Sequence, residues 1–176
     1  KNKLILEAQW FEILKEKNIS MLINNVGFLD NNDISLSKIK AMMDINCFSY
    51  QSVLHSLLPS LKQNGLGKKA IVNIGSQKSE REDDVPSVYF ATKKLCNNFV
   101  KAISIEVSNK NIDHFLVMPG IMKTPMLEGY AKGFANSFKG GLVSDDPAYI
   151  AKKAMDMISK GYHVNYGTER HAFLRI

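Results

Sequence analysis

Short, almost wholly apolar runs, each closed by a polar or glycine-containing turn, are the first pattern in the chain. They occupy residues 21–23, 70–74 and 114–118. Strands that are buried on both faces of a parallel sheet have this character, because neither face meets water. A shorter run at residues 164–166 is a candidate final strand. The pattern therefore predicts a parallel sheet.

Helical spacing of apolar residues fills the stretches between these runs. It predicts a short amphipathic helix at residues 4–14 and longer helices at 36–61, 86–107 and 147–160. Ser35 or Ser37 is suited to cap the second of these helices. Alternating helices and strands predict one α/β domain over residues 1–176, a doubly wound, Rossmann-like parallel sheet with helices on both faces.

The turns that follow the strands are expected to hold the functional residues, because ligands of such sheets bind beyond the carboxyl ends of the strands. These turns lie at residues 24–27, 75–76 and 119–120. A polar loop is expected at 77–84. Glycines interrupt the pattern between 125 and 143, which is typical of a flap over a substrate site.

Charge and composition exclude several classes of function. The formal net charge is +6, but the lysines are scattered and do not alternate with aromatic residues, so no nucleic-acid partner is predicted. Cys47 and Cys96 lie in helical patterns and the histidines lack metal-ligand spacing, so neither a disulfide nor a metal is expected. No apolar run approaches the ~18 residues of a membrane-spanning helix.

Tyr89 and Lys93 form the pair with the clearest chemical meaning. They are four residues apart on one predicted helix, so their side chains share a face. A lysine ammonium beside a phenol is expected to lower the tyrosine pKa from its usual value of about 10 toward the range of acid-base catalysis. Ser76, at the end of the preceding strand, is placed to hydrogen-bond the same carbonyl oxygen of a substrate.

A second tyrosine and lysine at the same spacing, Tyr149 and Lys153, provide an internal comparison. Thirteen residues before Tyr89 stands Ser76 at a strand end, whereas thirteen before Tyr149 stands Asn136 in a glycine-broken loop. Tyr89 is therefore the predicted catalytic residue and Tyr149 an ordinary surface residue.

Five motifs in order resemble those of the short-chain dehydrogenase/reductase family. They are Asn24-Asn25-Val26-Gly27, Asn46, Ser76, Tyr89-Phe90-Ala91-Thr92-Lys93 and Pro119-Gly120-Ile121-Met122-Lys123-Thr124. The resemblance extends from about residue 10 to residue 166. It implies that Tyr89 is the general acid and base, that Lys93 lowers its pKa and holds the nicotinamide ribose, and that Ser76 orients the substrate carbonyl.

The resemblance also implies supporting roles. Asn46 would support a proton-relay water beside Lys93, or else satisfy buried backbone groups. Asn24 and Gly27 would line the adenosine side of the cofactor, or simply shape a turn. The residues implied to face the nicotinamide are Pro119, Gly120, Ile121 and Thr124.

Within the family, the sequences at 24–27 and 89–93 are similar to those of the 17-beta-hydroxysteroid dehydrogenase and very-long-chain 3-oxoacyl-CoA reductase group. This similarity implies the reduction of a ketone on a lipid-like substrate, either a 3-oxoacyl-CoA or a steroid. It favours NADPH over NADH as the reductant. It also implies attachment to the endoplasmic reticulum membrane, with a cytoplasmic or mitochondrial location as the alternative. The family resemblance implies a homo-oligomer or a subunit of a larger assembly. The strongly charged segment 77–84 leaves the substrate class open.

The glycine-rich turn that holds a cofactor pyrophosphate is not found among the 176 residues. The family's first half is therefore expected upstream of Lys1, and this segment alone is not expected to bind a dinucleotide normally. The alternative hypothesis is a non-catalytic, dehydrogenase-like subunit of a larger assembly.

The strand after Asn18 would lack a neighbour on one side without that first half, which leaves an unpaired sheet edge. Residues 1–176 expressed alone are therefore expected to aggregate or to stay loosely folded. Size-exclusion chromatography and thermal melting test this expectation, and a soluble monomer with one sharp melting transition would contradict it.

Overall fold

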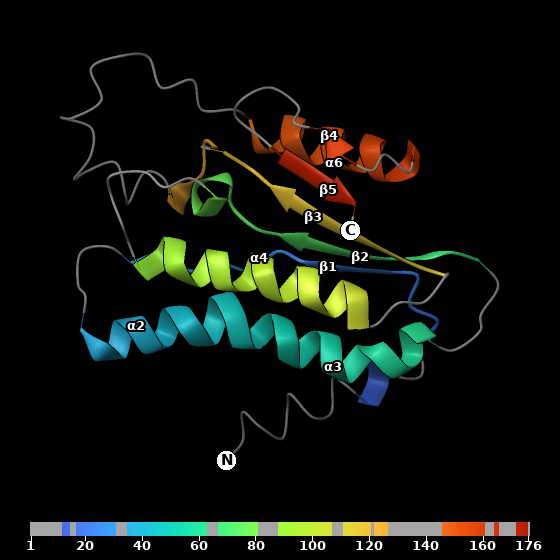
Figure 1. Cartoon of the computed structure of the whole chain (residues 1–176), viewed down its shortest axis with the longest axis horizontal. Coiled ribbons are helices and arrows are strands. Elements are labelled where there is room, and N and C mark those ends of the chain that lie inside the picture. The colour runs from blue at the N-terminus through green and yellow to red at the C-terminus, as the bar shows by residue number, and fades with distance from the viewer. Residues whose placement is uncertain are drawn as a thin grey trace.

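A computed structural model describes most of the chain (Figure 1). The described residues are 12–14, 17–30, 35–62, 67–80, 88–106, 111–120, 122–126, 146–160, 164–165 and 172–175. Of the first predicted helix only residues 12–14 fall in this part, and they are helical. Of the predicted flap, only Pro125 and Met126 are described.

Three parallel strands form the centre of a five-stranded sheet, in agreement with the apolar runs. They are β1 (Met21–Asn24), β2 (Lys69–Ile74) and β3 (Ile112–Met118), and they pair in that order. The predicted parallel sheet is confirmed for these strands. At one edge β5 (Ala172–Arg175) is antiparallel to both of its neighbours, β3 and β4 (Val164–Asn165), so β4 runs in the same direction as β3. Six residues separate β4 from β5, which is too few for a parallel crossover, so the two strands pair as antiparallel neighbours. Strand β5 was not predicted.

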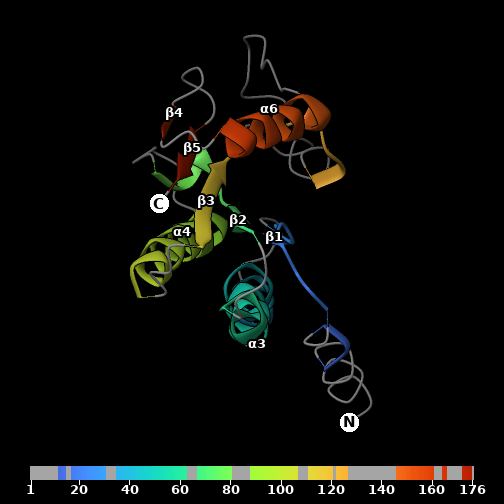
Figure 2. The ribbon, with the colours of Figure 1, turned by 90° about the vertical axis from the view of Figure 1, so that its right-hand side faces the viewer.

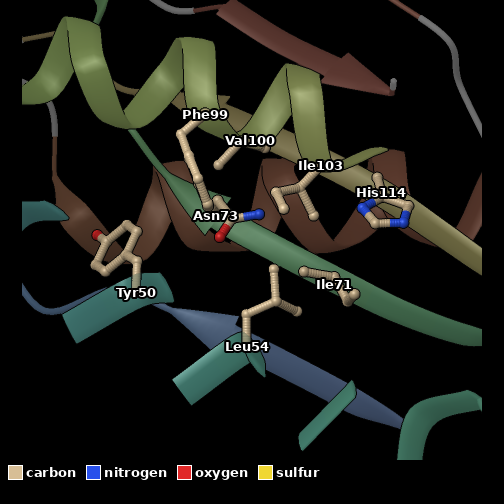
Figure 3. A pocket seen from close by; sticks show the side chains of 8 residues that line it. All are labelled: Tyr50, Leu54, Ile71, Asn73, Phe99, Val100, Ile103 and His114. Carbon is tan, nitrogen blue, oxygen red and sulfur yellow. The ribbon is translucent and has the colours of Figure 1, made fainter. Parts of the chain in front are cut away.

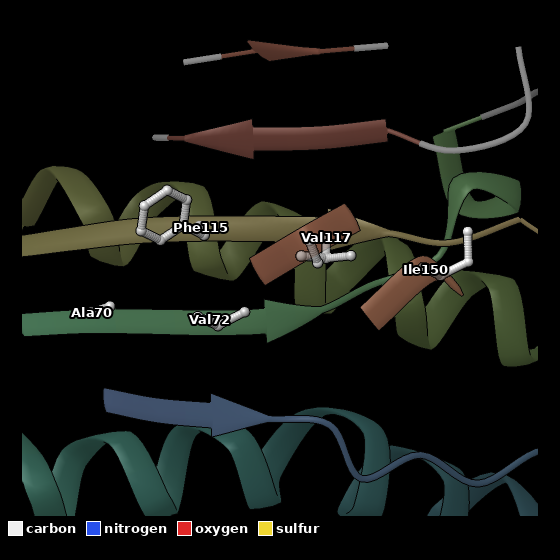
Figure 4. Close-up of a cluster of buried hydrophobic side chains, with 6 residues drawn as sticks. Ala70, Val72, Phe115, Val117 and Ile150 are labelled. Carbon is white, nitrogen blue, oxygen red and sulfur yellow. The ribbon is translucent and has the colours of Figure 1, made fainter. Parts of the chain in front are cut away.

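Helices cover both faces of the sheet, as predicted (Figure 2). One face carries α6 (Pro147–Lys160), whose Ile150 packs on Val72 and Val117 in a buried apolar cluster (Figure 4). The opposite face carries α3 (Ser49–Lys62) and α4 (Val88–Glu106). Successive strand residues point to opposite faces, so Ile71 packs under α3 while its neighbour Val72 packs under α6.

The long helix predicted at 36–61 contains an irregularity that the sequence did not reveal. It consists of α2 (Leu36–Met43), a π-helical turn η1 (Asp44–Phe48) and α3, with Ser35 at the N-cap position. Asn46 and Cys47 lie in this π turn, and both are buried. Such turns occur often at functional sites.

The polar loop predicted at 77–84 begins instead with a short 3-10 helix, η2 (Gln77–Glu80). The backbone N–H and the hydroxyl of Ser79 both turn back to the carbonyl oxygen of Ser76, at 3.2 and 2.5 Å, and close this turn. Residues 81–84 lie outside the described part of the chain.

In the described part of the chain, β1 stands at the edge of the sheet, as the sequence led us to expect. It pairs with β2 alone, and the side chain of Ile23 is 51% exposed. Among the described helices, none combines the length and the apolar character that a membrane crossing requires.

Leu116 lies at the centre of the sheet, fully buried against α4 with Cys96 and Val100. We expect Leu116→Ala to lower the free energy of unfolding by about 2–5 kcal/mol, because the lost side chain leaves a cavity. Urea denaturation of the longest natural polypeptide that contains this chain measures it. Ile105→Ala on the exposed face of α4 is the control, and an equal effect of both variants would contradict the buried position of Leu116.

Candidate active site

The turns that follow β1, β2 and β3 meet at one end of the sheet, beyond the carboxyl ends of these strands. The backbone N–H of Gly75 donates to the carbonyl of Val117 at 2.8 Å, and that of Gln77 donates to the carbonyl of Pro119 at 3.0 Å. These two bonds join the turn that carries Ser76 to the turn that begins with Pro119. The first turn, at Gly27 and Phe28, approaches the same region through Lys93 and Asn46.

Lys93 is a buried lysine whose ammonium lies beside these turns. Its side chain extends from α4 and is 3% exposed, and its ammonium donates to the carbonyl of Ile74 at 3.2 Å. Burial lowers the Lys93 pKa, while the nearby thiols of Cys96 and Cys47 oppose this shift. A buried cation at the ligand end of an α/β sheet is a strong indication of a functional site.

Gly27 makes room for this ammonium. A Cβ atom at residue 27 would lie 3.3 Å from Lys93 Nζ and 3.8 Å from Asn46 Oδ1. That separation from Nζ is tighter than ordinary packing, so a side chain at Gly27 would press on the lysine. The absence of a side chain therefore lets the first turn approach Lys93 closely.

Tyr50 is a residue of the site that the sequence reasoning missed. Its ring centroid lies 5.6 Å from Lys93 Nζ, in the range of a cation–π contact, and its hydroxyl donates to the Ile74 carbonyl at 3.1 Å. Burial, with smaller contributions from Cys96 and other neighbours, raises the Tyr50 pKa, so the phenol stays neutral. Its position four residues after Asn46, on the same helical face, is the signal that would have identified it.

Tyr50 also borders a small cavity between α3, α4 and the sheet (Figure 3). The cavity has space for about one water molecule. It is therefore too small for a substrate. The candidate site lies at the turns, not inside the fold.

Tyr89 lies one helical turn before Lys93 on α4. Its pKa is raised, whereas the sequence led us to expect a lowered value. Burial raises the pKa of Tyr89 to about 12. The predicted lowering by Lys93 is thus wrong for this structure, because the ammonium is directed to the Ile74 carbonyl and the Tyr50 ring. At neutral pH the Tyr89 phenol keeps its proton.

Asn46 satisfies buried backbone, which is the second of the two roles considered for it. It is fully buried, its Oδ1 accepts from the N–H of Phe28 at 2.7 Å, and its Nδ2 donates to the Phe28 carbonyl at 2.8 Å. The same Nδ2 donates to the hydroxyl of Thr92 at 2.9 Å, and that hydroxyl donates to the carbonyl of Tyr89. Asn46 therefore joins the π turn to the first turn of the site and to α4.

The remaining predicted residues occupy different places. Asn24 is buried and donates from Nδ2 to Oδ1 of Asn73 at 2.8 Å, so its amide serves the pairing of β1 with β2. Ser76 and Thr124 are partly buried and Pro119 is buried, while Ile121 lies outside the described residues.

No group of three or more possible metal-ligating side chains occurs within the described ranges. Cys47 and Cys96 are free and buried there, and burial raises the pKa of both thiols. The Cys47 thiol donates to the Thr92 carbonyl at 3.2 Å. Both thiols are therefore neutral packing groups around Lys93 at neutral pH.

The fold and the site together define an α/β protein whose polar site residues lie at the carboxyl ends of parallel strands. Dinucleotide-binding sheets bind their ligands at this position. The family model described as short chain dehydrogenase matches residues 8–133, which is well over half of the chain. The chain belongs to the short-chain dehydrogenase family.

Individual relatives are similar at low to moderate identity. The 3-oxoacyl-[acyl-carrier-protein] reductase FabG of Buchnera aphidicola is 31% identical, over 89% of this chain and 69% of the relative. The hydroxysteroid dehydrogenase-like protein 1 of Gallus gallus is 27% identical, over 66% of this chain and 36% of the relative. A short-chain dehydrogenase from Sphingobium yanoikuyae, solved in complex with NADPH, superimposes with a TM-score of 0.73 at 23% identity, covering 87% of this chain and 59% of that one.

The chain spans only part of most of these proteins. The share is 37% of a Drosophila melanogaster relative named dehydrogenase/reductase SDR family protein 7-like, and 61% of an uncharacterized oxidoreductase from Staphylococcus haemolyticus. Family membership is therefore established for this segment, and the activity of the whole protein is a matter for proposal.

The raised pKa of Tyr89 predicts how the protein titrates. A phenol with a folded pKa of about 12 and an unfolded pKa of about 10 contributes stability that is fully present below pH 10 and lost between pH 10 and pH 12. NMR titration of ring-labelled tyrosine, with Tyr89→Phe to assign the signal, should find a midpoint near 12 in the ligand-free protein. A midpoint below 10 would mean that Lys93 dominates after all.

Proposed function

We propose that this chain is part of an NADPH-dependent reductase of a ketone on a lipid-like substrate, such as a 3-oxoacyl thioester or a steroid. One observation carries the proposal. A buried ammonium, that of Lys93, lies at the ligand end of the sheet on the same helix as Tyr89, a phenol that is protonated at neutral pH. The Tyr89 phenol of such a pair can hold its proton at neutral pH and donate it to a substrate oxygen.

The neutral phenol of Tyr89 supports the proposal of reduction. Reduction of a ketone places negative charge on the carbonyl oxygen, and a neutral phenol is the form that can donate a proton to it. The bound nicotinamide would supply the hydride. Ser76, two residues beyond the strand end at Ile74, would donate a hydrogen bond to the same oxygen and orient the ketone.

The residues at the carboxyl ends of the strands suit the nicotinamide and ribose end of a dinucleotide. The ammonium of Lys93 is a donor for ribose hydroxyls, and the bare backbone of Gly27 leaves the approach to it open. Pro119, Gly120, Ile121 and Thr124 would border the nicotinamide. Asn24 would contribute by fixing the turn, because its amide is already bonded to Asn73.

The choice of a lipid-like substrate is supported by the names of the relatives, which include a 3-oxoacyl reductase and a hydroxysteroid dehydrogenase-like protein. The methionines near the third turn give it less support. Met118 is buried and Met122 packs against the core, while Met126 is 39% exposed. A homo-oligomer is proposed on the family resemblance, and attachment to the endoplasmic reticulum on the subgroup resemblance alone.

The assignment of Tyr89 is tested in the longest natural polypeptide that contains this chain. Tyr89→Phe should lower the rate of NADPH-dependent ketone reduction by about 10²–10⁴-fold, because it removes the proton donor. Tyr149→Phe is the matched control, since Tyr149 has a lysine at the same spacing, with Lys153 Nζ 4.9 Å from its ring, but is 49% exposed. The control variant should retain full activity, and unchanged reduction by Tyr89→Phe would overturn the assignment.

Calorimetry with NADPH on the same polypeptide separates this function from the alternative of an accessory subunit. Binding would justify a screen of 3-oxoacyl-CoA and steroid ketones. Failure to bind would favour a fold retained for assembly without catalysis.

A further inference from the structure

Asn97 lies on α4 one helical turn after Lys93, and its side chain is fully buried. We propose that Asn97 is a positioning residue that fixes the turn carrying Ser76 at a set place relative to Tyr89 and Lys93. This inference rests on the proposed function, because it assigns a role to Ser76 in holding the substrate.

A chain of hydrogen bonds connects Asn97 to Ser76. The Nδ2 group of Asn97 donates to the Ser79 hydroxyl at 2.7 Å, and that hydroxyl donates to the Ser76 carbonyl at 2.5 Å. The N–H of Ser79 donates to the same carbonyl at 3.2 Å. Because Ser79 is buried, water does not readily replace these bonds, and the amide of Asn97 supports the backbone of Ser76 through the Ser79 hydroxyl.

The amide also determines which residue can precede Ser76. A Cβ atom at Gly75 would lie 2.2 Å from Asn97 Oδ1 and 3.2 Å from Leu116 Cδ1. The first of these separations is a clash, so the Asn97 side chain occupies the space that a side chain at residue 75 would need. Gly75 and Asn97 therefore form a matched pair across the gap between β2 and α4.

Asn97 has a second anchor on the sheet, because its Nδ2 also lies 3.3 Å from the sulfur of Met118 at the end of β3. Tyr89, Lys93 and Asn97 recur every four residues on α4 and share one face. The helix that supplies the proton donor thus also holds the turn that supplies the substrate-orienting hydroxyl. A displacement of about 1 Å between such groups can reduce a rate by about 10²-fold.

The matched pair is tested first by stability, without any measurement of activity. In the longest natural polypeptide, Gly75→Ala should lower the urea midpoint strongly in the wild-type background and much less in the Asn97→Ala background, where the clash with Oδ1 is gone. A non-additive double-mutant cycle of this sign supports the pairing. Equal effects of Gly75→Ala in both backgrounds would overturn it.

The positioning role is tested by separating kcat from KM. Asn97→Ala and Ser79→Ala should each lower kcat for ketone reduction by about 10- to 100-fold with the KM for NADPH unchanged, because Lys93 keeps its own contacts. Asn98→Ala, at the exposed next position of α4, is the control and should leave both constants unchanged. Ser79→Ala decides the matter if Asn97→Ala does not fold.

The outcomes distinguish this inference from the proposed function. If Tyr89→Phe abolishes reduction while Asn97→Ala and Ser79→Ala keep the wild-type kcat, the positioning role is wrong and the proposed function stands. If Tyr89→Phe leaves reduction unchanged, the proposed function falls and the catalytic role of Asn97 falls with it, while the stability cycle still decides whether Asn97 holds the Gly75 turn.

Discussion

The burial of the Lys93 ammonium is the constraint on which the rest of the site depends. Moving a cation out of water costs several kcal/mol, whereas a hydrogen bond to a charged group contributes about 1.5–3 kcal/mol and a desolvated cation–π contact about 2 kcal/mol. The contacts of Lys93 with the Ile74 carbonyl and the Tyr50 ring are of these two kinds. Burial lowers the Lys93 pKa despite these contacts.

The protonation states of the site follow from the same environment. Burial works against the charged form of each group, so it lowers the pKa of Lys93 and raises those of Tyr50 and Tyr89. The Lys93 ammonium donates its hydrogen bond to the Ile74 carbonyl and does not lower the pKa of the Tyr89 phenol. The phenols of Tyr50 and Tyr89 are consequently protonated at neutral pH in the ligand-free site.

Helix α4 links the parts of the site into one unit. On one side Thr92 contacts Asn46, which bonds both backbone groups of Phe28 after β1. On the other side Asn97 contacts Ser79, which bonds the backbone of Ser76 after β2. A single rigid element therefore sets the relative places of two turns that are about fifty residues apart in the chain.

The sequence by itself determined the elements and the family motifs, because both depend on local patterns. Apolar runs identified β1, β2 and β3, and the spacing of Tyr89, Lys93 and Ser76 selected this site over the Tyr149 pair. The tertiary structure alone decided the π turn around Asn46, the antiparallel strand β5 and the pKa of Tyr89. It also revealed Tyr50 and Asn97 as supports of Lys93 and Ser76. These features depend on contacts between residues remote in sequence and on the loss of water around them, and neither leaves a periodic trace in the chain.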